Sequence, residues 1–271
     1  MEETILLETK ELKKEYTLKA KTLFNKEPEV LAAVNGVSLQ VNTGETLGIV
    51  GESGCGKSTF ARLITRLITP TSGKVIFQGK ELTTIKSEEI REVRKDIQMI
   101  FQDPYASLDP RKRVLQLLVE PLEIHNVGTK AERKEMALDM LEKVGLQKGY
   151  ANRFPHEFSG GQCQRINIAR ALMLKPKLII CDEPVSALDV SIQAQVLNLL
   201  LDLQEQFNLT YVFISHDLNV VRYFCDRIAV MYMGQVVEYA DAETVYNQPQ
   251  HEYTKKLLGA IPTRIEKAEE E

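Results

Sequence analysis

The residues Gly51-Glu-Ser-Gly-Cys-Gly-Lys-Ser58-Thr59 decide the fold class, because a glycine-rich turn here ends in Lys-Ser-Thr. An apolar run over 46–50 precedes the turn, and a helical pattern over 57–67 follows it. Strand, turn and helix in this order form the context of a phosphate-binding P-loop. Glycines let the backbone wrap an anion, and the helix dipole adds positive potential. We therefore predict a nucleoside triphosphate site, with Lys57 at the β- and γ-phosphates and Ser58 on Mg²⁺.

Length and composition favour an ordinary globular protein. The 271 residues suit one large domain or two subdomains. Apolar content of 44% and charged content of 27% lie in the usual range for soluble proteins. The 34 basic and 38 acidic side chains leave a net charge of −4, which gives no electrostatic reason to expect nucleic acid as a partner.

The sequence also limits the compartment in which the chain works. It contains no apolar run long enough to span a bilayer, and its first residues lack the pattern of a secretion signal. The cysteines are widely spaced, which predicts neither a structural zinc site nor a disulfide framework and fits a reducing cytosol. They are Cys55, Cys163, Cys181 and Cys225. Cys55 lies near a helix start, but we interpret it as a small loop residue rather than a redox centre.

The first half of the chain is expected to begin with strands and to continue with helices. Strands are clearest over 4–9 and 30–41, with a polar surface loop over 19–29 between them. Residues 75–78 before Gly79 indicate a hairpin piece, and 98–102 a further short strand. From 103 to 149 the pattern is helical, and Thr129 and Glu132 form a capping box.

Strand and helix alternate again in the second half. Buried strands are predicted over 178–181 and 211–215, and helices over 165–174, 191–207 and 218–225. A hairpin around Gly234 is expected over 227–239. This alternation predicts an α/β nucleotide-binding core with a parallel-dominated sheet covered on both faces, and a helical insertion over roughly 103–168.

A second anion site is predicted where Ser159-Gly-Gly-Gln162 precedes a helix. Ser159 is a good N-cap, and the glycines expose backbone donors at the positive helix end. Taken alone, the motif would indicate only a capped helix start. Its neighbours favour the functional interpretation, because the chain also carries a carboxylate pair and a histidine at the ends of predicted strands.

Those carboxylates are Asp182 and Glu183, which end the apolar strand over 178–181. Adjacent strand residues point to opposite faces, so the two should have different roles. Asp182 fits a Mg²⁺ partner beside a P-loop, and Glu183 is then free to orient or deprotonate the attacking water. His216 follows the strand over 211–215, where its imidazole would meet the γ-phosphate.

With these motifs in order, the chain resembles the ATP-binding-cassette (ABC) ATPases over essentially its whole length. The match includes the P-loop, Gln102 within Phe101-Gln-Asp-Pro104, the signature Phe158-Ser-Gly-Gly-Gln162, the segment Ser186-Ala-Leu-Asp189 and His216. A P-loop kinase would have no use for the last three. Phe158 stands where the family usually has leucine and keeps the position apolar.

The resemblance implies a role for each matching residue. Glu183, His216, Gln102 and Lys57 would act in ATP hydrolysis, and Ser58, Gln102 and Asp182 would bind Mg²⁺. Tyr16 would stack on adenine, with Phe24 as the alternative. Asp189 would pass between two subunits. The remaining ATP-binding residues would be the P-loop residues Gly51, Glu52, Ser53, Gly54, Cys55, Gly56 and Thr59, and the signature residues Ser159, Gly160, Gly161 and Gln162 of the facing subunit.

The resemblance also implies the domain plan. One ABC ATPase domain would cover 1–271, with a nucleotide-binding core and N-terminal antiparallel β-subdomain formed by 1–102 and 169–240. A helical subdomain would occupy 103–168, and a C-terminal extension 241–271.

Within the family, the stretch 101–111 and the ending 250–262 resemble the ATPases of oligopeptide and dipeptide importers. Nickel or other small-solute importers share much of this pattern, and a non-transport ABC ATPase is a further alternative. The implied partners are a second ATPase subunit, identical or related, two membrane-spanning permease subunits and, indirectly, a solute-binding receptor. The chain would then sit peripherally on the cytoplasmic face of the membrane. No cysteine follows Cys225, so we expect no iron–sulfur centre.

Overall fold

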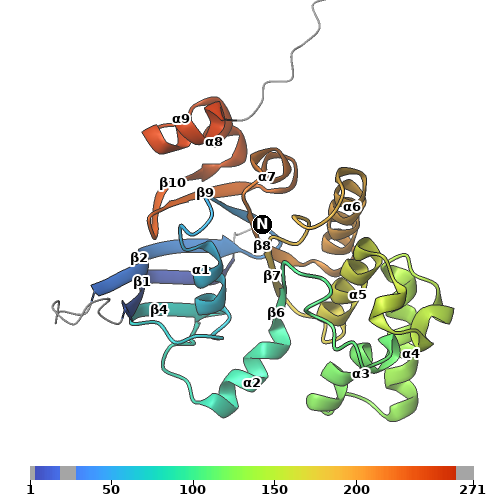
Figure 1. The fold of residues 1–271 in the computed structure, drawn as a ribbon. Helices are drawn as coiled ribbons and strands as arrows, with labels where there is room; N and C mark the ends of the chain where they lie inside the picture. Colours follow the sequence, from blue (N-terminus) through green and yellow to red (C-terminus); the bar gives the residue numbers. More distant parts are fainter. Residues whose placement is uncertain (1–3, 19–28, 261–271) are drawn as a thin grey trace, which may run out of the picture.

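The computed structural model describes residues 4–18 and 29–260, whose strands form two sheets (Figure 1). The smaller sheet has four antiparallel strands in the order β2-β1-β4-β5. Its strands are β1 (Ile5–Leu18), β2 (Glu29–Asn42), β4 (Ser72–Phe77) and β5 (Lys80–Glu81). It is the predicted N-terminal antiparallel β-subdomain.

The larger sheet has six strands in the order β10-β9-β3-β8-β7-β6, all parallel except β10. They are β3 (Thr46–Val50), β6 (Ile97–Ile100), β7 (Leu178–Asp182), β8 (Thr210–Ser215), β9 (Arg227–Tyr232) and β10 (Gln235–Asp241). Every residue of β3, β7 and β8 is buried. Because both faces of these strands are covered, their sequences are mostly apolar and do not alternate with polar residues.

Helices cover both faces of this sheet (Figure 1). They are α1 (Lys57–Ile64), α2 (Ser87–Asp96), α3 (Val114–Ile124), α4 (Lys130–Lys143), α5 (Gly160–Leu172), α6 (Val190–Phe207), α7 (Leu218–Phe224), α8 (Ala242–Asn247) and α9 (Glu252–Gly259). Two 3₁₀ turns, η1 (Lys148–Asn152) and η2 (Pro155–Glu157), lead into α5. Among the residues that the structure describes, no helix has the length and apolar character needed to cross a bilayer.

Two hydrophobic clusters lie on the two faces of the six-stranded sheet. Ile179 belongs to the cluster with α3 to α6, whereas Ile180 belongs to the cluster with α1 and the antiparallel sheet. Alternating strand residues therefore enter different cores, as the pleat requires. Strand register also brings the carboxyl ends of β3, β7 and β8 together, since Val50 pairs with Ser215 and Asp182 with Ile214. Ligands of α/β sheets bind at this edge.

Most of the predicted elements are confirmed. The hairpins turn at Gln78–Gly79 and at Met233–Gly234, and Thr129 and Glu132 form the predicted capping box at the start of α4. Strand β1 continues to Leu18, beyond the predicted end at residue 9. Most of the predicted 19–29 loop lies outside the described residues, as does Phe24.

The clearest differences from the sequence prediction concern the helices. Residues 103–113, predicted to be helical, form turns, and the first helix of this stretch, α3, begins at Val114. Helix α1 ends at Ile64 rather than at 67, because Arg66 adopts a left-handed backbone with φ 54°. Helix α5 begins at Gly160, five residues before the predicted start at 165. Helix α2 was not predicted, because most of its sequence, SEEIREVRKD, is charged and only Ile90 and Val93 mark its apolar face.

Candidate functional site

The P-loop connects the end of β3 to the start of α1. Gly56 is the N-cap of α1 with φ 111°, and a Cβ at this position would lie 2.1 Å from the carbonyl oxygen of Ala33. Only glycine fits this backbone. No side chain caps the helix, so the first N–H groups of α1 remain available to an anion.

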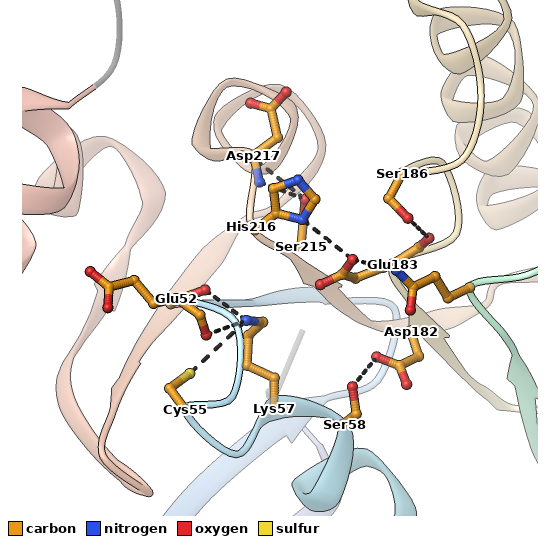
Figure 2. Close-up of polar contacts among 12 residues, drawn as sticks. Glu52, Cys55, Lys57, Ser58, Asp182, Glu183, Ser186, Ser215, His216 and Asp217 are labelled. Carbon is orange, nitrogen blue, oxygen red and sulfur yellow. Dashed lines mark hydrogen bonds and ion pairs between the residues drawn. The ribbon is translucent and has the colours of Figure 1, made fainter.

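Lys57 is buried in the loop that precedes it (Figure 2). Its Nζ donates to the carbonyl oxygens of Gly51 at 2.6 Å and of Glu52 at 2.9 Å. The Sγ of Cys55 lies farther away, at 4.0 Å. An ammonium group has three donors, so two hold Lys57 to the loop and the third can reach a phosphate. Burial raises the pKa of the Cys55 thiol and keeps it protonated.

Ser58 and Asp182 meet at the base of the site. The Ser58 hydroxyl donates to Oδ1 of Asp182 at 3.0 Å, and burial raises the pKa of this carboxyl. A hydroxyl and a carboxylate are hard oxygen donors, so the pair fits Mg²⁺. No group of three His, Cys, Asp or Glu side chains that could hold a metal occurs among the described residues. Mg²⁺ sites of this kind commonly use only one or two protein side chains and take their other ligands from water and substrate phosphates.

Glu183 lies between two polar side chains from separate segments. Its Oε2 accepts a hydrogen bond from Nε2 of Gln102 at 3.0 Å and lies 3.3 Å from Nδ1 of His216. Figure 2 shows Glu183 directed toward His216, while Asp182 points toward Ser58. The two carboxylates therefore diverge as predicted, but not through strand alternation. Strand β7 ends at Asp182, and Glu183 adopts a left-handed backbone with φ 49°.

A hollow of about 370 Å³ opens in front of these groups. Its walls include Lys57, Ser58, Gln102 and Glu183, together with Tyr16 from β1. The exposed ring of Tyr16 thus faces the P-loop across the hollow, although more than 30 residues separate them in sequence. The structure brings all of these predicted residues to one place.

The signature residues lie elsewhere in the chain's own fold and do not line this hollow. Ser159 is the N-cap of α5: its Oγ accepts from the N–H of Gln162 at 3.4 Å, and Oε1 of Gln162 accepts from the N–H of Ser159 at 3.1 Å. Gly161 packs against α6, where a Cβ would lie 2.5 Å from Cγ2 of Ile192. Asp189 is exposed at the N-cap of the same α6 helix.

Two buried amides on α5, which we did not predict, connect the separate motifs. Nε2 of Gln164 donates to the carbonyl of Pro184, directly after Glu183, at 2.7 Å. Nδ2 of Asn167 donates to the carbonyl of Pro104, two residues after Gln102, at 2.9 Å. The available signal was a polar pair spaced three residues apart on an otherwise apolar helix face.

Comparisons with known proteins agree with this geometry. The family model for ABC transporters matches residues 34–186. The chain is 53% identical to the oligopeptide transport ATP-binding protein AppF of Bacillus subtilis, over 96% of this chain and 79% of that protein. It is 55% identical to OppF of Salmonella typhimurium, which has the same description, over 95% of this chain and 78% of that protein.

Solved structures with the same fold include dimeric cassettes. The structure of the ATP-binding cassette MJ0796, a dimer in a post-hydrolysis state bound to ADP and Pi, is similar with a TM-score of 0.76 and 32% identity, and the match covers 88% of this chain and 99% of that chain. CbiO1 from Clostridium perfringens, described as part of the transporter complex cbiONQ, has a TM-score of 0.76 at 26% identity over 96% of this chain and 97% of that chain.

Proposed function

Because this chain belongs to the ABC transporter family, we propose that it is the ATP-hydrolysing subunit of an importer of oligopeptides or dipeptides. The observation that carries the catalytic part is Glu183, placed between Gln102 and His216 at the rim of the P-loop hollow. The names of the relatives support the peptide cargo, since both are oligopeptide transport ATP-binding proteins.

Each side chain has a defined task in this proposal. Tyr16 stacks on adenine, the P-loop wraps the phosphates, and Lys57 offers its third N–H to them. Ser58, Gln102 and Asp182 would hold Mg²⁺, which would neutralise charge on the phosphates. Glu183 orients or deprotonates the attacking water, and Gln102 and His216 hold its carboxylate toward that position.

A complete site in this proposal needs two copies of the cassette. The capped N-terminus of α5 with Ser159, Gly160 and Gly161 contacts the γ-phosphate bound by the P-loop of the facing subunit. Three features support this arrangement: these residues do not line their own chain's hollow, Ser159 is exposed, and a similar cassette is a dimer. Asp189, exposed at the start of α6, lies between the subunits.

The membrane partners would dock beside Gln102. A groove there runs between the edge strand β6 and helix α5, and its lining includes the exposed apolar side chains Leu67 and Phe101. Residues 103–168 would form the helical subdomain on one side of this groove. A permease segment in the groove would contact the residue next to Gln102, and so connect membrane movement to the state of the nucleotide. The chain would thereby be held peripherally at the cytoplasmic face.

Purification from membranes tests the transport role. Tagged chain extracted in mild detergent should recover two permease subunits, identified by mass spectrometry, and added peptide receptor with peptide should stimulate its ATPase activity. Leu67→Glu should reduce permease recovery at least about tenfold, because a buried charge opposes docking. Ile5→Glu, at a similarly exposed apolar position on β1, should leave recovery unchanged.

Permease recovery with receptors for nickel or another small solute would move the cargo away from peptides. Recovery of ribosomal or chromosomal proteins with no permease would overturn the transport role.

A further inference from the structure

We propose that Tyr253, in the C-terminal segment, is a positioning residue for nucleotide binding, which it supports by orienting the peptide group that holds Lys57. This inference rests on the proposed ATP site at the P-loop. It assigns a role to the ending 250–262, which the proposed catalytic scheme does not use.

The first observation is a contact across almost the whole chain. The backbone N–H of Glu52 donates to the hydroxyl oxygen of Tyr253 at 3.0 Å, although 201 positions separate the two residues. Glu52 is the second residue of the P-loop, and Tyr253 lies in the first turn of α9. The C-terminal segment therefore touches the backbone of the phosphate-binding loop.

The second observation is that the peptide group between Gly51 and Glu52 is held from both ends. Its N–H donates to Tyr253, while its carbonyl oxygen accepts from Nζ of Lys57 at 2.6 Å. The N–H and C=O of a trans peptide point in opposite directions, so Tyr253 and Lys57 bind on opposite sides of one rigid plane. Rotation of this plane would break both hydrogen bonds together.

The third observation is that Tyr253 is itself fixed in place. Its ring is buried and packs on Tyr232 with centroids 4.2 Å apart. Nδ1 of His251 caps α9 by accepting from the N–H of Tyr253 at 3.1 Å. The carboxylate of Glu238 on β10 accepts from the N–H groups of Gln250 and His251 at 2.8 and 3.0 Å. The hydroxyl of Tyr253 is thus presented to the P-loop by a rigid support.

These contacts define what loss of the hydroxyl should do. Without it, the N–H of the Gly51–Glu52 peptide loses its partner, and the orientation of the Gly51 carbonyl is less firmly fixed. The ammonium of Lys57 is then held firmly only by the carbonyl of Glu52 before ATP binds. Ordering that group would then oppose binding. Glu183, His216 and Gln102 are not among these contacts, and bound ATP itself should order the ammonium of Lys57. The rate of hydrolysis at saturating ATP should therefore stay near the wild-type value.

Tyr253→Phe removes the hydroxyl and keeps the ring against Tyr232. We expect the Kd for ATP and the KM of hydrolysis to rise about 3- to 10-fold, the range for one lost hydrogen bond, while kcat stays within about twofold. Tyr239→Phe is the matched control, because its hydroxyl also bonds to backbone, the carbonyl of Gln40 at 2.6 Å, but on β2 away from the P-loop. The control should leave the Kd unchanged.

A double-mutant cycle tests the route through Lys57. The Kd for ATP is measured with and without Tyr253→Phe in the wild-type and Lys57→Ala backgrounds. In the Lys57→Ala background, Tyr253→Phe should change this Kd by less than about twofold, because the group that Tyr253 positions is gone. Equal losses in both backgrounds would overturn the proposal. So would a wild-type Kd for Tyr253→Phe, or a loss matched by Tyr239→Phe. Failure of the wild-type chain to bind ATP would instead overturn the proposed function itself.

Discussion

The two helix N-termini assigned to phosphate, those of α1 and α5, are built in different ways. Helix α1 starts at Gly56 without a side-chain cap, and Lys57 and Asp182 lie beside it. Helix α5 starts at Ser159 and is capped reciprocally by its own Gln162. The backbone N–H groups at the start of α1 and the charged side chains beside them are therefore available to a ligand. At the start of α5, part of the backbone hydrogen-bonding capacity is already used by the side chains of Ser159 and Gln162.

Helix α4 shows what the cap of α5 means by itself. Thr129 and Glu132 form the same reciprocal cap, yet α4 has Lys130 and Ala131 where α5 has Gly160 and Gly161. A capping box by itself therefore indicates the start of a helix and not a phosphate site. In the proposed arrangement, the glycines of α5 let a phosphate approach the helix end. Because the first turn of α5 has no basic side chain, this end would be a partial site, which needs the P-loop of a second subunit to be complete.

The largest effect should come from Glu183→Gln, which tests whether ATP is hydrolysed by the groups beside the N-terminus of α1. The amide cannot accept the proton of the attacking water, so kcat for ATP hydrolysis should fall about 100-fold or more while ATP binding is retained. Steady-state phosphate release and equilibrium ATP binding measure the two quantities. Glu205→Gln, the same change at an exposed acid on α6 outside the hollow, should stay within about twofold of wild type. Near-normal turnover of Glu183→Gln would remove the proposed base.

Ser159→Arg tests whether the α5 end faces another subunit. The exposed position tolerates a long side chain in the isolated chain, but its bulk should block closure of the two-subunit sandwich. In the Glu183→Gln background, ATP-dependent dimers should disappear in light scattering, while the Kd for ATP of the monomer changes less than about twofold. Dimers that persist would contradict the partial-site assignment.

The smallest effect separates capping from function. Thr129→Ala and Ser159→Ala each remove one N-cap hydroxyl, and each should lower the free energy of unfolding by about 1 kcal/mol. Urea titration measures this change. Only Ser159→Ala should also reduce ATPase activity of the assembled dimer. If both variants reduced activity equally, the cap of α5 would have no role beyond helix stability.

Sequence patterns correctly predicted the elements whose structure is set by interactions between residues close in sequence. The P-loop, the buried strands β7 and β8, the capping box of Thr129 and Glu132 and the N-cap Ser159 depend on residues a few positions apart, and all are present. Helix α2 was not predicted because it has only two apolar residues, Ile90 and Val93. The end of α1 at Ile64 depends on the left-handed backbone of Arg66, which the side-chain pattern does not indicate.

The amino-acid sequence by itself determined the family, the α/β class and the identity of the polar side chains at the sheet edge, because glycine spacing and strand–helix alternation are properties of neighbouring residues. Only the tertiary structure decided which of these groups meet. The register of β3, β7 and β8 brings the P-loop that follows β3, Asp182 at the end of β7 and His216 after β8 to one edge. Helix α9 places Tyr253 against Glu52 of this loop, 201 positions away in sequence. Such contacts follow from packing in three dimensions, which no pattern of adjacent residues contains.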